Sequence, residues 1–225
     1  MCIRDRTGTL TDGSTILFSS TGFSSSILFS SDILSNVTLT SGAVPALDLS
    51  PIVISTDDPN RPSGLRPGQT LTLVAGGELG NNFNVIDATL NVEGGSLDFN
   101  AASTNSTVNI SGGSVGDFYV AYPSSEVNIS GGTVGRCSSV GSGSVANITG
   151  GTVGDDCSAI LDSVFNISGG TVGESFNVTS GSQVNITGGT VGDRFEIQNG
   201  ELNLSGGSVG ERFVIFPSSA DSVRQ

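Results

Sequence analysis

A glycine-containing unit that recurs through most of the chain limits what this sequence can fold into. Gly-Gly pairs begin at intervals of 18 or 19 residues, at Gly76, Gly94, Gly112, Gly131, Gly150, Gly169, Gly188 and Gly206. The later units read VNISGGTVG, ANITGGTVG, FNISGGTVG, VNITGGTVG and LNLSGGSVG. Self-similarity at such a period is typical of repeat proteins, in which one small unit stacks on copies of itself.

One unit, residues 184–200, reads VNITGGTVGDRFEIQNG. Apolar residues alternate in VNI and FEI, and a lone valine lies between them, which indicates three short strands separated by corners. Glycine pairs and β-branched residues disfavour a helix. A three-strand unit this short buries little alone, so the units must stack. We predict an all-β, single-stranded parallel β-solenoid of about eight coils, each with three short strands. The rule for parallel crossovers favours a right-handed one.

The alternation assigns three ladders of inward-facing side chains. The first is Leu73, Val92, Ile110, Ile129, Ile148, Ile167, Ile186 and Leu204. The second is Leu79, Leu97, Val115, Val134, Val153, Val172, Val191 and Val209. The third is Phe83, Ala101, Tyr119, Ser138, Cys157, Phe176, Phe195 and Phe213. Because the side chains of the third ladder become small in its middle, we expect the coils around Ser138 and Cys157 to be the least well packed.

An asparagine recurs on the outward side of the first strand, and Ser or Thr follows it two residues later. We expect the asparagines to form a hydrogen-bonded amide ladder. N-glycosylation of the N-x-[ST] tripeptides is the alternative. With rungs about 4.8 Å apart, this face could match a polymer chain or an ordered lattice. The candidate ligand-facing residues are Asn109, Ser111, Asn128, Ser130, Asn147, Thr149, Asn166, Ser168, Asn185, Thr187, Asn203 and Ser205.

Acidic residues recur at one corner, at Asp117, Asp155, Glu174, Asp193 and Glu211. A solvated acidic corner is the simpler interpretation, and weak calcium binding is the alternative, since carboxylates near backbone carbonyls suit this ion. The run GGTVGD is only superficially similar to the calcium-binding nonapeptide repeat, whose period differs. We expect no other metal and no cofactor.

Several kinds of chemistry are excluded by composition. The chain has no His, no Lys and no Trp, so triads and zinc sites that use imidazole cannot form. Its net charge of −13 argues against nucleic acid and anionic membranes as partners. The chain contains no run of 18 apolar residues, so the sequence predicts no transmembrane helix. The only local excess of carboxylates is Asp155, Asp156 and Asp162, with Arg136 one coil away. Two of these carboxylates could serve as acid and base in catalysis, but nothing in the sequence suggests a cleft, so we predict that the protein is not an enzyme.

The regions outside the repeat are less regular. Residues 1–6, MCIRDR, are similar to a translated sequencing-adapter remnant and are interpreted as a non-native leader. Residues 7–69 are expected to form an irregular β cap or the first coils, and residues 70–216 the solenoid. Residues 217–225 are interpreted as a truncated tail, so we expect a fragment. Cys2, Cys137 and Cys157 are expected to be unpaired.

The VNISGGTVG units resemble those of bacterial secreted β-helix proteins, including autotransporter-passenger and adhesin-like repeat proteins of pectin-lyase-like architecture. The resemblance covers residues 70–216. It implies export to the cell surface or the medium, and a role in adhesion or extracellular matrix, with a polysaccharide or a host surface as partner. Two alternatives stay open. One is a polysaccharide lyase or hydrolase scaffold or a carbohydrate-binding module. The other is an ice-binding face, although ice-binding solenoids favour Thr where Asn stands here.

Overall fold

The computed structural model describes residues 3–9, 15–21, 38–39, 48–56, 58–59 and 61–216, in two compact units, residues 1–48 and 49–225. In the first unit, β1 (Ile3–Thr9) pairs antiparallel with β2 (Thr15–Thr21) and with β3 (Thr38–Leu39). Residues 3–6 of the predicted leader belong to β1. The predicted tail, 217–225, and Cys2 lie outside the described residues.

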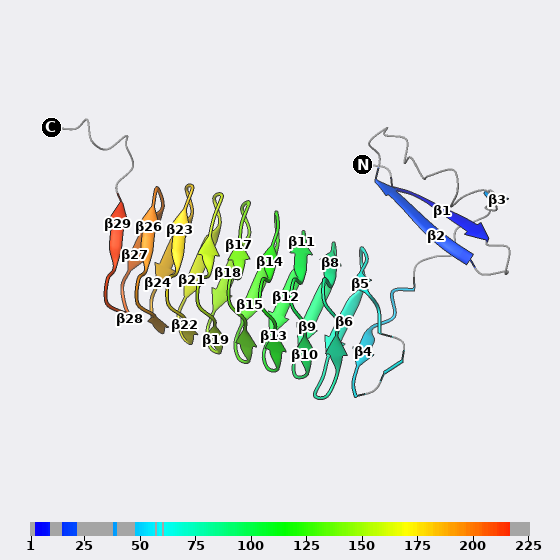
Figure 1. The fold of residues 1–225 in the computed structure, drawn as a ribbon, viewed down its shortest axis with the longest axis horizontal. Coiled ribbons are helices and arrows are strands. Elements are labelled where there is room, and N and C mark those ends of the chain that lie inside the picture. Colours follow the sequence, from blue (N-terminus) through cyan, green and yellow to red (C-terminus); the bar gives the residue numbers. More distant parts are fainter. Residues whose placement is uncertain are drawn as a thin grey trace. The chain divides into compact units, whose positions relative to one another are not determined.

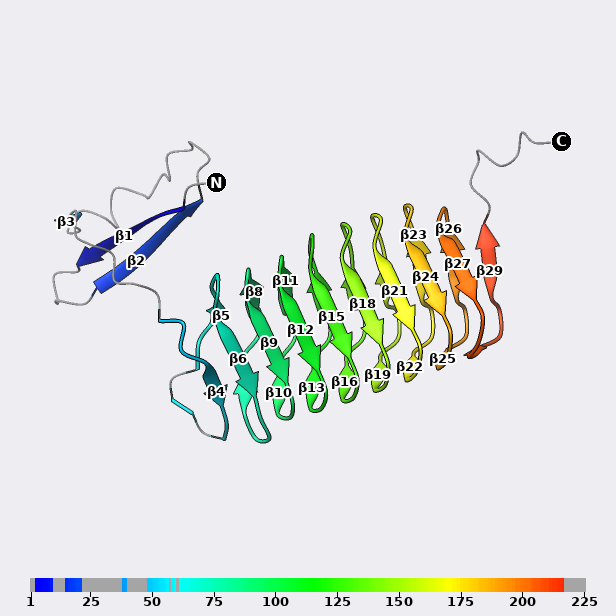
Figure 2. The ribbon, with the colours of Figure 1, turned by 180° about the vertical axis from the view of Figure 1, so that it is seen from behind.

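The second unit is a parallel β-solenoid built from three sheets (Figure 1). Sheet 1 contains β4 (Ile52–Ile54), β6 (Thr70–Leu73), β9 (Thr89–Val92), β12 (Thr107–Ile110), β15 (Glu126–Ile129), β18 (Val145–Ile148), β21 (Val164–Ile167), β24 (Gln183–Ile186) and β27 (Glu201–Leu204). Figure 2 shows these strands side by side along the stack. Each coil contributes one strand to this sheet and then turns a corner into the next sheet.

The other two sheets consist of shorter strands. Sheet 2 contains β7 (Glu78–Leu79), β10 (Ser96–Leu97), β13 (Ser114–Val115), β16 (Thr133–Val134), β19 (Thr152–Val153), β22 (Thr171–Val172), β25 (Thr190–Val191) and β28 (Ser208–Val209). Sheet 3 contains β5 (Gly64–Leu65), β8 (Asn84–Ile86), β11 (Ala102–Thr104), β14 (Val120–Ala121), β17 (Ser139–Val140), β20 (Ser158–Ala159), β23 (Asn177–Thr179), β26 (Glu196–Gln198) and β29 (Val214–Phe216).

The predicted fold is confirmed: the described part of residues 49–225 is an all-β parallel solenoid with three strands per coil. The coil count differs slightly, because sheets 1 and 3 each have nine strands where the sequence indicated about eight coils. The additional coil contains β4 and β5, and it has no Gly-Gly pair by which the sequence could have revealed it. Handedness stays a prediction.

The core is a set of stacked ladders, and the three predicted ladders are in register. Leu204 and Phe213, predicted to face inward, are exposed because they lie in the last described coil, which no further coil covers within the described residues. Ile129 pairs with Ile148, and Val134 with Val153. Rings of the third ladder stack at its C-terminal end, where Phe176 and Phe195 have centroids 5.2 Å apart. Two further inward ladders line sheets 1 and 3. They are Leu71, Leu90, Val108, Val127, Ala146, Phe165, Val184 and Leu202, and Val85, Ser103, Ala121, Val140, Ala159, Val178, Ile197 and Ile215.

The Gly-Gly corners are required by the close approach of neighbouring coils. A Cβ on Gly169 would lie 2.3 Å from the carbonyl oxygen of Thr149 in the preceding coil. The second glycine, Gly170, has a φ of +71°, which L side chains rarely adopt. One glycine therefore permits contact between coils, and the other permits the turn.

A row of buried serines precedes the strands of sheet 1, at Ser106, Ser125, Ser144, Ser163 and Ser182. Ser144 donates a hydrogen bond to the Tyr122 carbonyl at 2.6 Å and accepts one from the Ser125 amide at 3.1 Å. Ser106, Ser144 and Ser182 therefore bond to backbone groups at the third corner. The Ser163 hydroxyl bonds to that of Ser182, and the Ser125 hydroxyl is buried without a hydrogen-bond partner among the described residues. Sequence reasoning missed this row, although the serines recur every 19 residues.

Candidate functional site

The asparagines of sheet 1 form a continuous hydrogen-bonded ladder, as predicted. Each side-chain Nδ2 donates to Oδ1 of the asparagine one coil earlier, at 2.8 to 3.0 Å. The ladder contains Asn91, Asn109, Asn128, Asn147, Asn166, Asn185 and Asn203. At the N-terminal end of the ladder, Asn91 donates to the hydroxyl of Thr72 in the preceding coil at 3.4 Å. The predicted orientation is correct, since the neighbours Val184 and Ile186 are buried while Asn185 is half-buried at the surface.

The ladder leaves part of each amide available to a ligand. A primary amide has two N–H donors and two acceptor lone pairs, and stacking uses one of each. The remaining donor and acceptor lie on a half-buried outer surface, and only at Asn147 does a second bond form, to the Glu126 carboxylate at 3.3 Å, among the described residues. The other outward position of sheet 1 varies among Thr89, Glu126 and Val145, so the asparagines are the regular feature of this sheet.

The predicted Ser/Thr row lies directly after the strands of sheet 1, and all six of its members are exposed. Three hydroxyls approach a carbonyl of the preceding coil, at 3.5 Å for Ser130, 3.4 Å for Thr149 and 3.5 Å for Ser168. These distances lie at or beyond the limit of a useful hydrogen bond, so the hydroxyls are accessible to other partners. The structure therefore places the two rows beside each other, one half-buried and one exposed.

The corner between sheets 2 and 3 holds the acidic residues, and three of them accept a hydrogen bond from a backbone amide of the next coil. An Oδ1 of Asp117 accepts the backbone N–H of Arg136 in the next coil at 2.8 Å. Asp155 and Asp193 bind the amides of Glu174 and Glu211 in the same way, at 2.9 and 2.7 Å. Charge-assisted bonds of this kind give Asp117, Asp155 and Asp193 a structural role between coils. Sequence reasoning did not foresee this role.

The residue whose amide an aspartate binds is preceded by a glycine, because a side chain there would collide with the carboxylate. A Cβ on Gly135 would lie 2.3 Å from Oδ1 of Asp117, and one on Gly173 would lie 2.4 Å from Oδ1 of Asp155. The recurrent Val-Gly-Asp sequence is therefore one structural device, in which the glycine of one coil makes room for the carboxylate of the coil before it.

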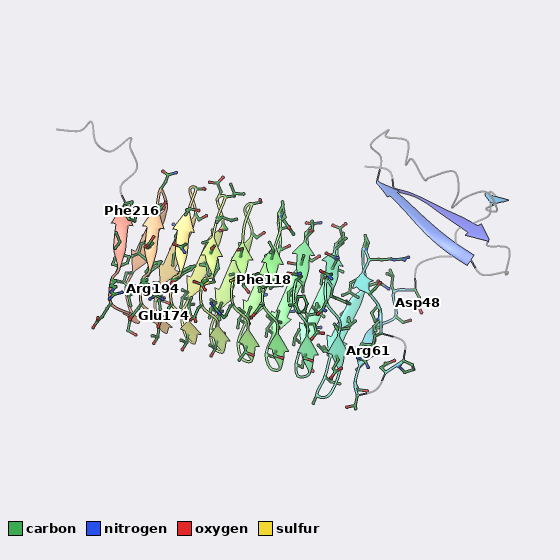
Figure 3. The ribbon with its side chains drawn as sticks, viewed as in Figure 1. Asp48, Arg61, Phe118, Glu174, Arg194 and Phe216 are labelled. Atoms are coloured by element: carbon green, nitrogen blue, oxygen red, sulfur yellow. The ribbon has the colours of Figure 1, made fainter. Side chains whose placement is uncertain are left out.

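Arginines neutralise part of this acidic corner. Arg194 pairs with Glu174 at 2.6 Å and donates to the hydroxyl of Ser175 at 3.0 Å. Figure 3 shows the labelled Arg194 and Glu174 close together. Arg136 pairs with Asp156 at 2.9 Å. Among the described residues, no three Cys, Asp or Glu side chains are grouped as they would be around a metal ion.

The residues considered for acid–base chemistry are only partly brought together. Asp155 and Asp156 share one corner with Arg136, where Asp155 binds a backbone amide and Asp156 an arginine. Asp162 lies at the following corner, beyond β20, with a φ of +60°. The two corners are separated by a strand, so these three carboxylates do not converge.

Two buried groups titrate abnormally. Burial raises the pKa of the Cys157 thiol from 9.0 to about 12. Burial also raises the pKa of Tyr119, whose hydroxyl is within hydrogen-bond distance, 2.8 Å, of the Ser103 hydroxyl. Cys137 and Cys157 are both free thiols, as predicted. Both titrating groups belong to the core rather than to an accessible site.

No protein-family model, curated protein or solved structure matches this chain significantly. Within the described residues there is no helix long and apolar enough to cross a membrane. The faces of the solenoid therefore provide the geometry from which a function can be inferred.

Proposed function

We propose that this protein is a non-enzymatic structural or adhesive β-solenoid of the cell surface or extracellular space, which binds polysaccharide or a host or matrix surface through its Asn and Ser/Thr rows. The observation that carries this proposal is the unbroken amide ladder from Asn91 to Asn203. Location is inferred from the resemblance of the repeat units to those of bacterial secreted β-helix proteins.

The arrangement suits a long neutral polymer. A coil offers a second amide donor, a second amide acceptor and one exposed hydroxyl, and the next coil repeats them about 4.8 Å further along. In the coil of β18 the second donor of Asn147 is instead directed to the Glu126 carboxylate, at 3.3 Å. A polysaccharide carries hydroxyls that donate and accept at regular intervals. Because the ladder fixes the amides in advance, binding costs little side-chain entropy. The half-buried position of the asparagines also limits competition from water.

The test is adsorption of the full chain to insoluble neutral polysaccharides, cellulose and chitin, measured by depletion from solution. We expect binding by the unchanged chain and a loss of at least about tenfold when Ser130→Ala, Thr149→Ala and Ser168→Ala are combined, since three hydroxyl contacts of about 0.5–1.5 kcal/mol each are removed. These side chains are exposed, so the fold should persist.

The matched control removes three exposed hydroxyls from the same coils on sheet 2, by Thr133→Ala, Thr152→Ala and Thr171→Ala. This control should bind as the unchanged chain does. Equal adsorption by both triple variants would contradict the proposed face. Release of reducing or unsaturated sugar ends during incubation would contradict the non-enzymatic assignment, and thermal hysteresis lost only in the first variant would favour an ice lattice as the partner.

A further inference from the structure

The repeat is broken at one corner between sheets 2 and 3, where two aromatic rings are exposed. Most later coils have glycine and then a charged residue at this corner, but the coil of β10 has Asp98 and Phe99 there. One coil later, Phe118 follows Asp117. Phe99 and Phe118 are 49% and 52% exposed. Two large apolar side chains gathered in one exposed place indicate an interaction site more often than isolated ones do.

These rings border an open hollow of about 530 Å³. Its lining residues come from two successive coils and are Ser96, Leu97, Asp98, Phe99, Ser114, Gly116, Asp117 and Phe118. Phe118 is labelled in Figure 3. The hollow lies across the Gly-Gly corner and sheet 2 from the Asn ladder, so it is separate from the face proposed above.

The backbone at Phe118 does not favour phenylalanine. Its φ is +61°, and the same position holds Asn82 and Asn100, both with a φ of +60°, in the two preceding coils, and a polar or small residue in each later coil. Asparagine tolerates this left-handed conformation, whereas a bulky residue there is an outlier. The ring is half exposed, so core packing does not account for its presence. The residue is therefore better explained by what its exposed ring contacts in a complex.

The charges around the hollow favour a cation. The carboxylate of Asp98 makes no hydrogen bond or ion pair within the described part of the chain. Asp117 uses Oδ1 to bind the Arg136 amide, which leaves Oδ2 available. The guanidinium of Arg136 is held by Asp156. The faces of phenyl rings carry negative potential, so rings and carboxylates together attract a positive group that is weakly hydrated.

We propose that this hollow, formed by Phe99, Phe118, Asp98 and Asp117, binds an organic cation, such as an ammonium group carried by a ligand. The rings contact its apolar surface and the carboxylates balance its charge. This inference does not depend on the polysaccharide face, because it uses a different corner of the solenoid.

The test is a titration of the full chain with choline, followed by the backbone amide signals of residues 96–99 and 114–118 in ¹H–¹⁵N NMR spectra. The matched probe is 3,3-dimethylbutan-1-ol, which has the same shape without the charge. We expect choline to shift these signals, the neutral probe to leave them unchanged, and added salt to weaken binding. Equal binding of the two probes, or no shift with choline, would overturn the proposal, as would binding of a neutral N-acetylglucosamine oligomer alone.

Two variants separate recognition from folding. Asp98→Asn and Phe118→Asn should each weaken choline binding about two- to fivefold. Phe118→Asn should also raise the melting temperature, because asparagine suits the local backbone. A lower melting temperature would show that the ring stabilises the fold, and unchanged choline affinity in either variant would overturn the site. The control Glu196→Gln removes one charge from β26 on sheet 3, in a distant coil, and should bind choline normally.

Discussion

An interior asparagine of the ladder should contribute about twice as much stability as one at its end. Asn147 donates to Asn128 and accepts from Asn166, both at 2.8 Å, and its longer bond to the exposed Glu126 carboxylate, at 3.3 Å, adds little. Asn203 donates to Asn185 at 2.9 Å and accepts no ladder bond within the described residues. Each net hydrogen bond is worth about 1 kcal/mol. Asn147→Ala should therefore lower the free energy of unfolding by about 2 kcal/mol, and Asn203→Ala by about 1 kcal/mol or less.

Urea unfolding followed by far-ultraviolet circular dichroism measures the difference. Because stacked repeats can unfold in stages, amide hydrogen exchange in the coil of β18 provides a second readout. The control Thr149→Ala removes an exposed hydroxyl beside the ladder and should change stability by less than about 0.5 kcal/mol. Equal losses for Asn147→Ala and Asn203→Ala, or a loss for Asn147→Ala no larger than that of the control, would refute the reasoning.

Three further outcomes are expected. Gly169→Ala should lower the free energy of unfolding by about 3 kcal/mol or more, because the new Cβ would lie 2.3 Å from the Thr149 carbonyl oxygen. Gly143→Ala should lower it by only about 1–2 kcal/mol, because a Cβ there meets no atom within 4 Å and only the φ of +72° is unfavourable. Equal losses in urea unfolding would contradict this. Burial raises the pKa of Cys157 from 9.0 to about 12 and also raises that of Tyr119, so both groups stay protonated in the fold. The free energy of unfolding should therefore be highest below pH 9 and fall as pH rises toward 12, and a flat profile would contradict it. Neither calcium nor EDTA should move the melting temperature, because backbone amides bind Asp117, Asp155 and Asp193, Arg194 binds Glu174, and the carboxylates of the described residues are not grouped around a common point; a rise with calcium would show otherwise.

The architecture could be predicted because the same pattern of alternating apolar residues and glycine pairs recurs in every repeat unit. Strand positions, the inward ladders and the Asn ladder all follow from the alternation in units such as VNITGGTVG. The coil of β4 and β5 could be predicted only as an alternative to a cap, because these strands lie in a stretch with no Gly-Gly pair. Local alternation without a repeat does not distinguish a coil from a cap.

Features that depend on contacts between coils were harder to foresee. The buried serines recur visibly, but a serine beside a turn is ordinarily read as exposed. The role of Asp117 depends on the position of the Arg136 amide, which the order of residues does not reveal. The left-handed backbone at Phe118 is likewise invisible in the sequence, because that position holds Asn, Phe, Cys, Asp, Ser and Arg in different coils.

The most direct test of the account is the set of nuclear Overhauser contacts between asparagine side-chain amides in the full chain. The structure predicts contacts from Asn147 to Asn128 and to Asn166, each one rung away at about 4.8 Å, and none to Asn185 at about 9.6 Å. Contacts that follow this order along the ladder would establish the parallel register on which the proposed face depends. Contacts between Asn147 and residues of an antiparallel neighbour, or none to Asn128 and Asn166, would contradict the solenoid.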